Sequence, residues 1–331
     1  MKVIDMHCDT ISEIRDSREG EQKQSLRENT LQVDLMKMQK GDYLLQNFAL
    51  FVNVERQEDP FSAVIHLGDV FYQEMEKNKD IIRQVKCYQD IETNMKEGVM
   101  SALLTVEEGA ACKGDLAFLR TLYRLGVRMM TLTWNYPNEI GNPNFYKSDI
   151  YRSYMPEFDG SRGLTDVGID FLEEMERLGM IIDVSHLSDA GFWDVLHNTG
   201  KPFVASHSNA RALCGHGRNL TDDMIKALAE RGGVMGLNYF GMFLDSVRAD
   251  GRCPSSVKRM AEHARYIINV GGVDCLGLGS DFDGIGGDLE MQDCSMLPML
   301  EAELRKQGFH ESEIEKIFYK NVLGLYKELL V

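Results

Sequence analysis

The chain has 331 residues, of which 44% are hydrophobic and 27% are charged, a composition typical of a globular protein with a large buried core. Its formal net charge of −16 disfavours nucleic acid as a partner, because an acidic surface repels a phosphate backbone. No apolar run reaches the roughly 18 residues that cross a bilayer, and the start lacks a secretory-signal pattern, so we expect no membrane association.

The cysteine pattern indicates the redox environment. The chain has seven cysteines, which is an odd number, and none of them form a CxxC pair. Such a pattern favours reduced thiols over a disulfide framework. We therefore expect a cytoplasmic protein.

Eight short apolar runs have the composition of buried strands. In chain order they are residues 3–9, 43–52, 100–109, 128–134, 180–186, 202–208, 232–239 and 275–284. Stretches with helical periodicity separate them, and strands that alternate with helices form parallel sheets. Eight such units favour a closed (β/α)8 TIM barrel over an open doubly wound sheet. We expect one domain over residues 1–331, with segments near 10–42 and 135–163 forming a lid or rim at one mouth of the barrel.

Three of the helical stretches have recognisable faces or ends. We expect the first helix to end at Gly179. Its apolar residues share one face: Leu164, Val167, Phe171, Met175 and Leu178. Thr221 is the expected N-cap of a second helix, which closes at Gly232. Either Ser255 or Ser256 is the expected cap of a third helix.

Five of the eight predicted strands end in residues that bind metals or transfer protons. These residues are His7 and Asp9, Glu107 and Glu108, His186, His207, and Asp281 and Asp283. The carboxyl ends of the strands in a TIM barrel form one ring, where active sites lie. One histidine at a strand end is more often an ordinary core residue. Here three of the chain's eight histidines stand on the ring beside carboxylates, which indicates a metal centre.

The ligand types narrow the choice of metal. Histidine nitrogens and carboxylate oxygens suit zinc and related divalent ions, and one carboxylate can bridge two ions. Because side chains alternate along a strand, His7 and Asp9 point the same way and both can reach one ion. Cys8 between them should face the outer layer of the barrel.

Six motifs along the chain carry a family resemblance. They are "DMHCDT", "LLTVEEG", "GLTDVGIDFLEEMERLGMIIDVSHLS", "ASHSNARAL", "GRNLTDD" and "LGLGSDFDG". Together they resemble the bacterial members of the membrane (renal) dipeptidase family, metallopeptidase family M19, over nearly the whole chain. The resemblance implies an amidohydrolase-like, metal-dependent hydrolase barrel that holds two zinc ions, or other divalent ions in their place. It also implies small dipeptide substrates and a homodimer.

The resemblance assigns the metal ligands residue by residue. It implies that His7 and Asp9 bind the first zinc ion. It implies that His186 and His207 bind the second, and that Glu107 bridges the two ions.

The resemblance also implies roles in catalysis and substrate binding. Asp281 matches the aspartate that contacts the bridging water and carries its proton. Arg218, in "GRN", matches the arginine that holds the terminal carboxylate of the substrate, a role that suits the two-pronged guanidinium. Glu108 occupies a position that is often glycine in the family and is interpreted as a neighbour of the ligands. Asp283 is expected to shape its loop.

The chain departs from the family pattern at two places. Trp134 stands where the family has a histidine that helps to bind the substrate carbonyl, so polarisation of the carbonyl has to rest on a metal ion or on another donor. His216 is a candidate donor, although a plain surface histidine is the more frequent case. The "NYF" segment is offset from the family's tyrosine, and Tyr239 and Phe240 are interpreted as pocket walls.

These observations favour a zinc-dependent dipeptidase in which a metal-bridging hydroxide attacks the peptide bond. The family resemblance also implies tolerance of a C-terminal D-residue. The alternative is a binuclear metal amidohydrolase that acts on another small amide, a lactam or an N-acyl amino acid. A phosphoester substrate would require more basic groups than Arg218 alone. A barrel that binds metal without catalysis is disfavoured, because the chain keeps every expected ligand and the proton carrier.

Overall fold

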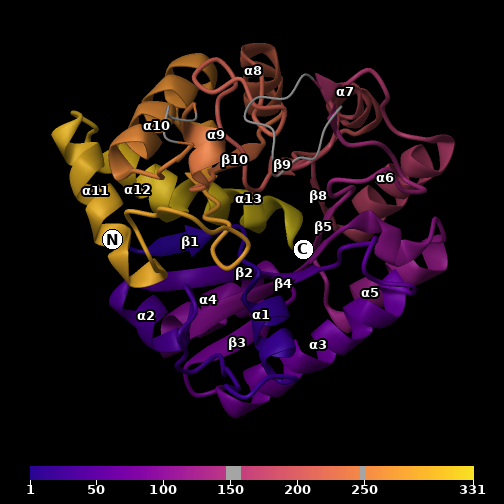
Figure 1. The fold of residues 1–331 in the computed structure, drawn as a ribbon, viewed down its shortest axis with the longest axis horizontal. Coiled ribbons are helices and arrows are strands. Elements are labelled where there is room, and N and C mark those ends of the chain that lie inside the picture. The colour runs from indigo at the N-terminus through magenta and orange to yellow at the C-terminus, as the bar shows by residue number, and fades with distance from the viewer. Residues whose placement is uncertain (147–157, 247–250) are drawn as a thin grey trace.

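A computed structural model describes residues 1–146, 158–246 and 251–331, and eight parallel strands of this part close into a barrel (Figure 1). The strands are β1 (Val3–Asp5), β2 (Tyr43–Phe51), β4 (Met100–Glu107), β5 (Met129–Thr131), β8 (Ile181–Asp183), β9 (Val204–Ala205), β10 (Val234–Leu237) and β11 (Leu276–Leu278). The ring is closed because β1 pairs with both β11 and β2, and β2 pairs with β4. Each strand lies in one of the eight predicted runs, so the predicted (β/α)8 barrel is confirmed.

One further strand of the main sheet was not expected from the sequence. β3 (Ile82–Val85) pairs with the first half of β4, whose second half pairs with β5. Two polar residues, Arg83 and Gln84, form its centre. A search for apolar runs misses such a strand.

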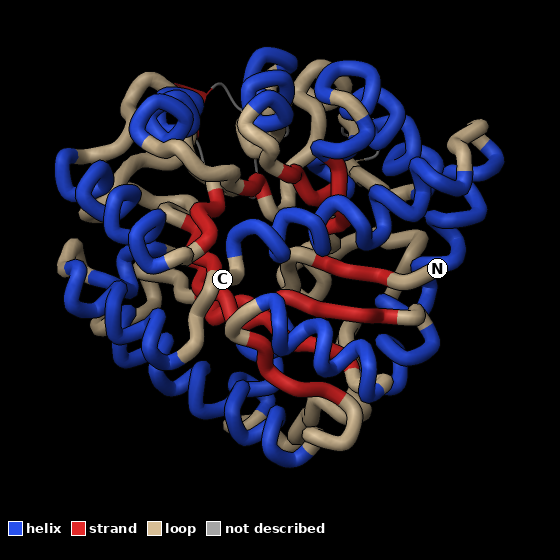
Figure 2. The backbone as a smooth tube through the Cα atoms, turned by 180° about the vertical axis from the view of Figure 1, so that it is seen from behind, coloured by secondary structure: helices blue, strands red, loops and turns tan. Residues whose placement is uncertain are grey.

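Most of the helices lie around the outside of the strands, as Figure 2 shows in blue and red. They are α1 (Thr10–Ser17), α2 (Leu35–Lys40), α3 (Pro60–Lys77), α4 (Tyr88–Glu97), α5 (Leu116–Leu125), α6 (Asp166–Leu178), α7 (Asp189–Asn198), α8 (Asp222–Glu230), α9 (Gly241–Leu244), α10 (Val257–Gly271), α11 (Leu297–Lys306), α12 (Glu311–Glu315) and α13 (Asn321–Leu329). Two short strands, β6 (Phe145–Tyr146) and β7 (Phe158–Asp159), form a separate antiparallel pair. In the part of the chain that the structure describes, no helix is both long and apolar enough to span a membrane.

The predicted N-caps and the predicted end of α6 are confirmed, whereas α8 ends at Glu230, two residues before Gly232. The hydroxyl of Thr221 accepts a hydrogen bond from the backbone of the first turn of α8, and Ser256 does the same for α10. Gly179 follows α6 in the left-handed conformation that favours glycine. Val167 was predicted to lie on the apolar face of α6. This is wrong, because the residue is 37% exposed.

The core has two parts, one inside the barrel and one between the strands and the helices. Side chains from the first residues of the strands fill the inside together with α13, whose Tyr326 hydroxyl exchanges hydrogen bonds with the Asn47 amide. Figure 2 shows the C-terminus among the strands. One end of the barrel is therefore closed by apolar packing, and the carboxyl ends of the strands are left for polar side chains.

The structure describes the predicted lid or rim segments only in part. Residues 10–42 contain α1 and α2, while residues 147–157 of the segment 135–163 lie outside the described residues. Their role as a lid, and the division of the chain into one domain, stay predictions.

Candidate metal centre

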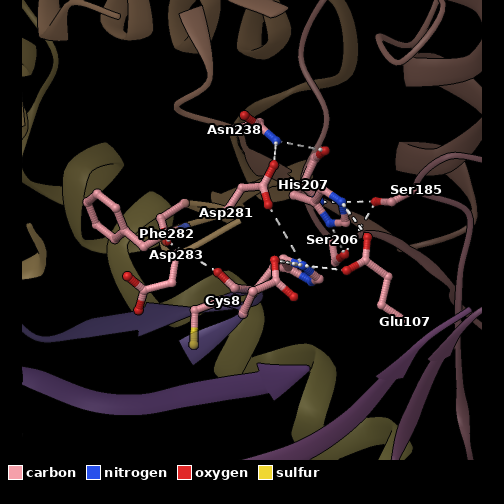
Figure 3. Close-up of polar contacts among 12 residues, drawn as sticks. Cys8, Glu107, Ser185, Ser206, His207, Asn238, Asp281, Phe282 and Asp283 are labelled. Carbon is pink, nitrogen blue, oxygen red and sulfur yellow. Dashed lines mark hydrogen bonds and ion pairs between the residues drawn. The ribbon is translucent and has the colours of Figure 1, made fainter. Parts of the chain in front are cut away.

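The five predicted metal ligands meet at the carboxyl ends of the barrel strands. Figure 3 labels two of them, Glu107 and His207. His7 and Asp9 follow β1, Glu107 ends β4, His186 follows β8 and His207 follows β9. Each of their side chains is less than 10% exposed. The barrel thus brings together ligands that are up to 200 positions apart (His7 and His207) and removes them from bulk water.

Glu107 lies between two groups of ligands. Its Oε2 atom is 3.2 Å from Nε2 of His7, which also lies 3.5 Å from Oδ2 of Asp9. Its Oε1 atom is 3.0 Å from Nε2 of His186 and 3.6 Å from Nε2 of His207. The rings of His7 and His207 are stacked, with centroids 3.9 Å apart, so the two groups are adjacent. This is the position of a carboxylate that could bridge two ions.

Hydrogen bonds on the far side of two imidazole rings set their orientation. The Nδ1 atom of His186 is 2.9 Å from the amide oxygen of Asn135, and that of His207 is 2.8 Å from the hydroxyl of Ser206. An amide oxygen only accepts, so Nδ1 of His186 carries the hydrogen and its Nε2 carries a lone pair. Partners of this kind orient the histidine ligands of metal sites.

Burial and neighbouring charges shift the pKa values of the three histidines and of Glu107. Burial lowers the pKa of His186 and of His207 well below the usual range, and the positive charge of Arg218 adds to this effect. Burial also lowers the pKa of His7, but the carboxylates of Glu107 and Asp9 outweigh it and raise that pKa well above the usual range. Burial raises the pKa of Glu107 to about 7. These shifts favour the neutral, metal-binding form of His186 and His207 and the protonated form of His7 in the metal-free protein.

The residues fit a metal ion better than they fit one another. The Nε2 atoms of His186 and His207 are 3.0 Å apart, although both rings are neutral and the former presents a lone pair. The buried atoms Nε2 of His7 and Oε2 of Glu107 lie 3.2 Å apart, yet neither completes a hydrogen bond within the described part of the chain. Two ligands of a tetrahedral zinc ion, each at about 2.0–2.1 Å from it, lie about 3.3 Å apart. The distances of 3.0–3.6 Å within the cluster match this spacing.

Asp281 follows β11 and faces the same cluster. Its Oδ1 atom is 3.9 Å from Nε2 of His7, and its Oδ2 atom accepts a hydrogen bond of 2.8 Å from the amide of Asn238. Burial raises the pKa of Asp281 to about 6.

The backbone around Asp281 is also constrained. The residue has a φ of 64°, a conformation that is strained for aspartate. A Cβ atom at Gly284 would lie 2.1 Å from Oδ2 of Asp9 and 2.7 Å from Oδ1 of Asp281, so only glycine fits behind the two carboxylates.

Arg218 is buried on the side of His207. Its Nη2 atom donates to the carbonyl oxygen of His207 at 3.2 Å, and its guanidinium lies over the ring of Phe243. His216 was expected on the surface, and this is wrong because the residue is only 2% exposed. Its Nδ1 atom accepts a hydrogen bond from the backbone N–H of Arg218 at 3.1 Å. His216 therefore supports the backbone of Arg218.

Trp134 lies beside the second group of ligands. Its ring centroid is 6.1 Å from that of His186 and 4.9 Å from that of Phe51, and the residue is 9% exposed. The indole thus forms an apolar wall next to His186. A role in substrate binding stays a prediction.

Glu108 is buried behind the cluster and fastens the segment that follows β5. One carboxylate oxygen accepts hydrogen bonds from the backbone of Ala110 and the amide of Asn138, and the other accepts from the backbone of Trp134 at 3.2 Å. Burial outweighs these contacts and raises the pKa of Glu108 to about 7. In agreement with its interpretation as a neighbour, Glu108 belongs to none of the potential ligand groups among the described residues.

The raised pKa of Glu108 predicts a pH-dependent stability. Its ordinary value is 4.5, so folding favours the protonated form. The resulting stabilisation is present in full below pH 4.5 and is lost as the pH rises through about 7. We expect Glu108→Gln to remove this dependence of the unfolding free energy on pH. The effect is a few kcal/mol at most, at ~1.4 kcal/mol per unit of pKa shift. Urea unfolding of the metal-free protein and of the variant at about pH 5 and about pH 8 measures this difference. An equal change in unfolding free energy between the two pH values in both proteins would contradict the prediction.

Asp283 is directed away from the cluster. Its carboxylate accepts hydrogen bonds from the hydroxyl of Thr10 at 2.6 Å and from the backbone of Gln32 at 2.7 Å. It thereby fastens the segment 10–42 to the end of β11, in line with the expectation that it shapes a loop. Cys8 packs in the core between the strands and the helices, as predicted.

Sequence reasoning missed the residues that support the ligands. Asn238 contacts Asp281, and Asn135 contacts His186. The interpretation of Tyr239 as a pocket wall is wrong, because its ring is 1% exposed and packs against Phe282 in the core. Asn238 could have been recognised as a polar residue inside the apolar run 232–239. Because neighbouring residues of a strand point to opposite faces, Asn238 and Tyr239 cannot both face the site.

Comparisons with known proteins identify the family of the chain. The family model "Membrane dipeptidase (Peptidase family M19)" matches residues 1–329. An uncharacterized protein of Klebsiella pneumoniae is 37% identical over 72% of this chain and 86% of its own length. An uncharacterized dipeptidase of Schizosaccharomyces pombe is 32% identical over 90% of this chain and 72% of its own length.

A solved structure extends the likeness to the whole fold. A metallopeptidase from Rhodobacter sphaeroides, crystallised with a phosphinate mimic of the dipeptide L-Ala-D-Ala, is 25% identical and superposes with a TM-score of 0.88 over 99% of each chain. Because the family model spans almost the whole sequence, the chain belongs to the membrane dipeptidase family, peptidase family M19, and is a metallo-dipeptidase of that family.

Proposed function

We propose that this protein hydrolyses dipeptides with two divalent metal ions, which we expect to be zinc, and that it accepts a D-residue at the C-terminal position. The observation that carries the proposal is the position of Glu107. Its two oxygens lie 3.2 Å from Nε2 of His7 and 3.0 Å from Nε2 of His186. A buried carboxylate between two groups of nitrogen ligands is suited to bridging two ions.

The ligands divide into two sets that share Glu107. His7 and Asp9 would hold one ion with it, and His186 and His207 would hold the other. When bound, a pair of ions supplies a water-derived nucleophile near neutral pH and positive charge opposite the carbonyl oxygen.

Asp281 is the group that we propose to move the proton. It would take a proton from the attacking water and deliver it to the leaving amine of the substrate. Its pKa of about 6, raised by burial, suits both steps, because an acid–base group works best near the operating pH. Asn238 binds Oδ2, so Oδ1 is the atom directed towards the reaction.

Arg218 is the group that we propose to bind the terminal carboxylate of the substrate. Its Nη2 atom donates to the carbonyl oxygen of His207 at 3.2 Å, so the guanidinium lies beside one of the proposed ligands. A third residue in the substrate would move the carboxylate by about 3.5 Å relative to the scissile bond. A fixed arginine therefore favours dipeptides over longer peptides.

The tolerance of a D-residue draws support from a relative. The Rhodobacter sphaeroides metallopeptidase binds a mimic of L-Ala-D-Ala, whose C-terminal residue is D-alanine. We propose the same tolerance here, with the apolar wall of Trp134 next to His186 as a determinant of which dipeptides fit.

We further propose a cytoplasmic homodimer. No disulfide joins any of the seven cysteines, all of which lie in the described ranges, and this fits a reducing compartment. The dimer rests on the family resemblance alone. Light scattering on the purified protein tests it.

The proposal predicts metal-dependent cleavage that is confined to dipeptides. Purified protein should contain about two metal ions per chain, and a chelator should lower its activity at least about tenfold until zinc is restored. The assay compares L,L- and L,D-dipeptides with a tripeptide and an N-acyl amino acid. A metal-loaded protein that cleaves only the N-acyl amino acid would favour the alternative amidohydrolase. A protein that takes up no metal would refute both.

A further inference from the structure

We infer that Asp183 is a positioning residue that acts through Ser206 to hold the ring of His207 with its Nε2 lone pair towards the metal centre. The inference rests on the proposed role of His207 as a metal ligand. It concerns a carboxylate that touches none of the ligand atoms itself.

Asp183 ends β8 and is completely buried. Its Oδ2 atom accepts hydrogen bonds of 2.6 Å from the hydroxyls of Thr131 and Ser206. Its Oδ1 atom accepts from the backbone N–H groups of Ser185 at 3.0 Å and of Ser206 at 2.9 Å. The carboxylate thus ties together β5, β8 and β9 immediately below two of the proposed ligands, His186 and His207 (the serines and His207 are labelled in Figure 3).

The number of available protons determines the direction of the chain of hydrogen bonds. The hydroxyl of Ser206 has a single hydrogen to donate. Its oxygen lies 2.6 Å from Oδ2 of Asp183 and 2.8 Å from Nδ1 of His207. A carboxylate only accepts, so the hydrogen of Ser206 goes to Asp183. The oxygen of Ser206 then accepts the hydrogen on Nδ1 of His207. The remaining nitrogen, Nε2, presents its lone pair to Glu107 and His186.

A second buried aspartate shows that this arrangement is particular to one half of the centre. Oδ1 of Asp5 accepts from the backbone N–H groups of His7 and Ser280, in the same pattern as Oδ1 of Asp183. The hydroxyl of Ser280, however, donates to the carbonyl oxygen of His7 and not to its ring. Asp5 therefore shapes backbone only, whereas Asp183 reaches an imidazole.

Two substitutions separate the positioning role from a general structural one. Ser206→Ala and Thr131→Val each remove one hydroxyl that donates to Oδ2 of Asp183 at 2.6 Å, but only the first removes the partner of His207. Competition titration with a zinc chelator measures the affinity for each metal equivalent. We expect Ser206→Ala to weaken one equivalent by about 10–100-fold and Thr131→Val to change it less than about threefold.

A spectroscopic measurement gives a readout that does not depend on activity or on metal. In metal-free protein with 15N-labelled histidine, His207 should carry its hydrogen on Nδ1 in the wild type and in Thr131→Val. In Ser206→Ala this preference should be lost. Thermal unfolding of both variants checks that they are folded to a similar degree.

The outcomes distinguish failure of the inference from failure of the proposed function. Equal metal affinities for Ser206→Ala and Thr131→Val overturn the positioning role, as does an unchanged tautomer in Ser206→Ala. If His207→Ala loses one metal equivalent while Ser206→Ala binds like the wild type, the positioning role alone is refuted. If His207→Ala keeps both equivalents, the ligand assignment fails and the inference fails with it.

Discussion

Replacing Asp281 by asparagine is expected to leave both metal ions bound and to lower kcat by about 10²–10⁴-fold. The amide has the shape of the carboxylate and keeps an oxygen that can accept the hydrogen bond from Asn238. It cannot, however, take a proton from the attacking water or return it to the leaving amine. Metal analysis together with steady-state kinetics on an L,D-dipeptide measures both parts of this prediction.

Asp283→Asn is the matched control for this prediction. Asp283 has the same residue type, a similar positive φ of 68° and a pKa that burial raises to about 6, but its carboxylate binds Thr10 and Gln32. Its replacement should lower stability through the segment 10–42 and affect kcat much less. Near-normal turnover in Asp281→Asn would contradict the proton-transfer role. An equal loss in Asp283→Asn would mean that the loss in Asp281→Asn reflects a disturbed loop.

The convergence of the ligands could be predicted because it depends on a general property of the fold. Parallel strands in a barrel share one edge, so residues that follow different strands meet there irrespective of their distance along the chain. His7, Glu107 and His207 illustrate this, since each stands at the end of an apolar run in the sequence. The alternation of faces along a strand likewise placed Asp9 with His7 and directed Cys8 into the outer core.

The supporting contacts could not be predicted, because they depend on distances of a few ångströms between segments that the pattern does not relate. Ser206 precedes a ligand, but nothing in the sequence indicates that its hydroxyl lies between Asp183 and a histidine ring. His216 is buried because it supports Arg218, a contact that arises from the path of the loop. Tyr239 was predicted to face the site, but the residue that does so is Asn238, one position earlier. A shift of one residue exchanges the two faces of a strand.

The positive φ angles are a further property that composition does not reveal. His186 and Asp281 adopt values of 70° and 64°, which are unfavourable for residues with side chains. Such strain persists where the surrounding structure fixes it, and it is concentrated at functional sites. Here it occurs at a proposed metal ligand and at the proposed proton carrier, where the backbone turns away from the strand.

The second large effect is expected for Glu107→Gln, which should lose at least one metal ion and about 10³-fold in kcat/KM (about 4 kcal/mol). The neutral amide supplies one oxygen and no negative charge, and its NH2 group has to face either His7 or His186. In the metal-free variant the pKa of His7 should fall, because the carboxylate of Glu107 is the largest of the charges that raise it. Metal analysis, kinetics and NMR titration of His7 measure the three effects.

Glu108→Gln is the matched control, since the two residues are adjacent in the chain, are both buried and both have a pKa that burial raises to about 7. The carboxylate of Glu108 binds Asn138 and the backbone of Trp134, so its replacement should leave both ions in place. If Glu107→Gln kept two ions, Glu107 could not be the bridge, and the two groups of ligands would have to bind metal independently. If Glu108→Gln lost as much metal as Glu107→Gln, the loss would reflect general damage to the end of β4. Only a difference between these neighbours assigns the metal centre to the carboxylate that lies between His7 and His186.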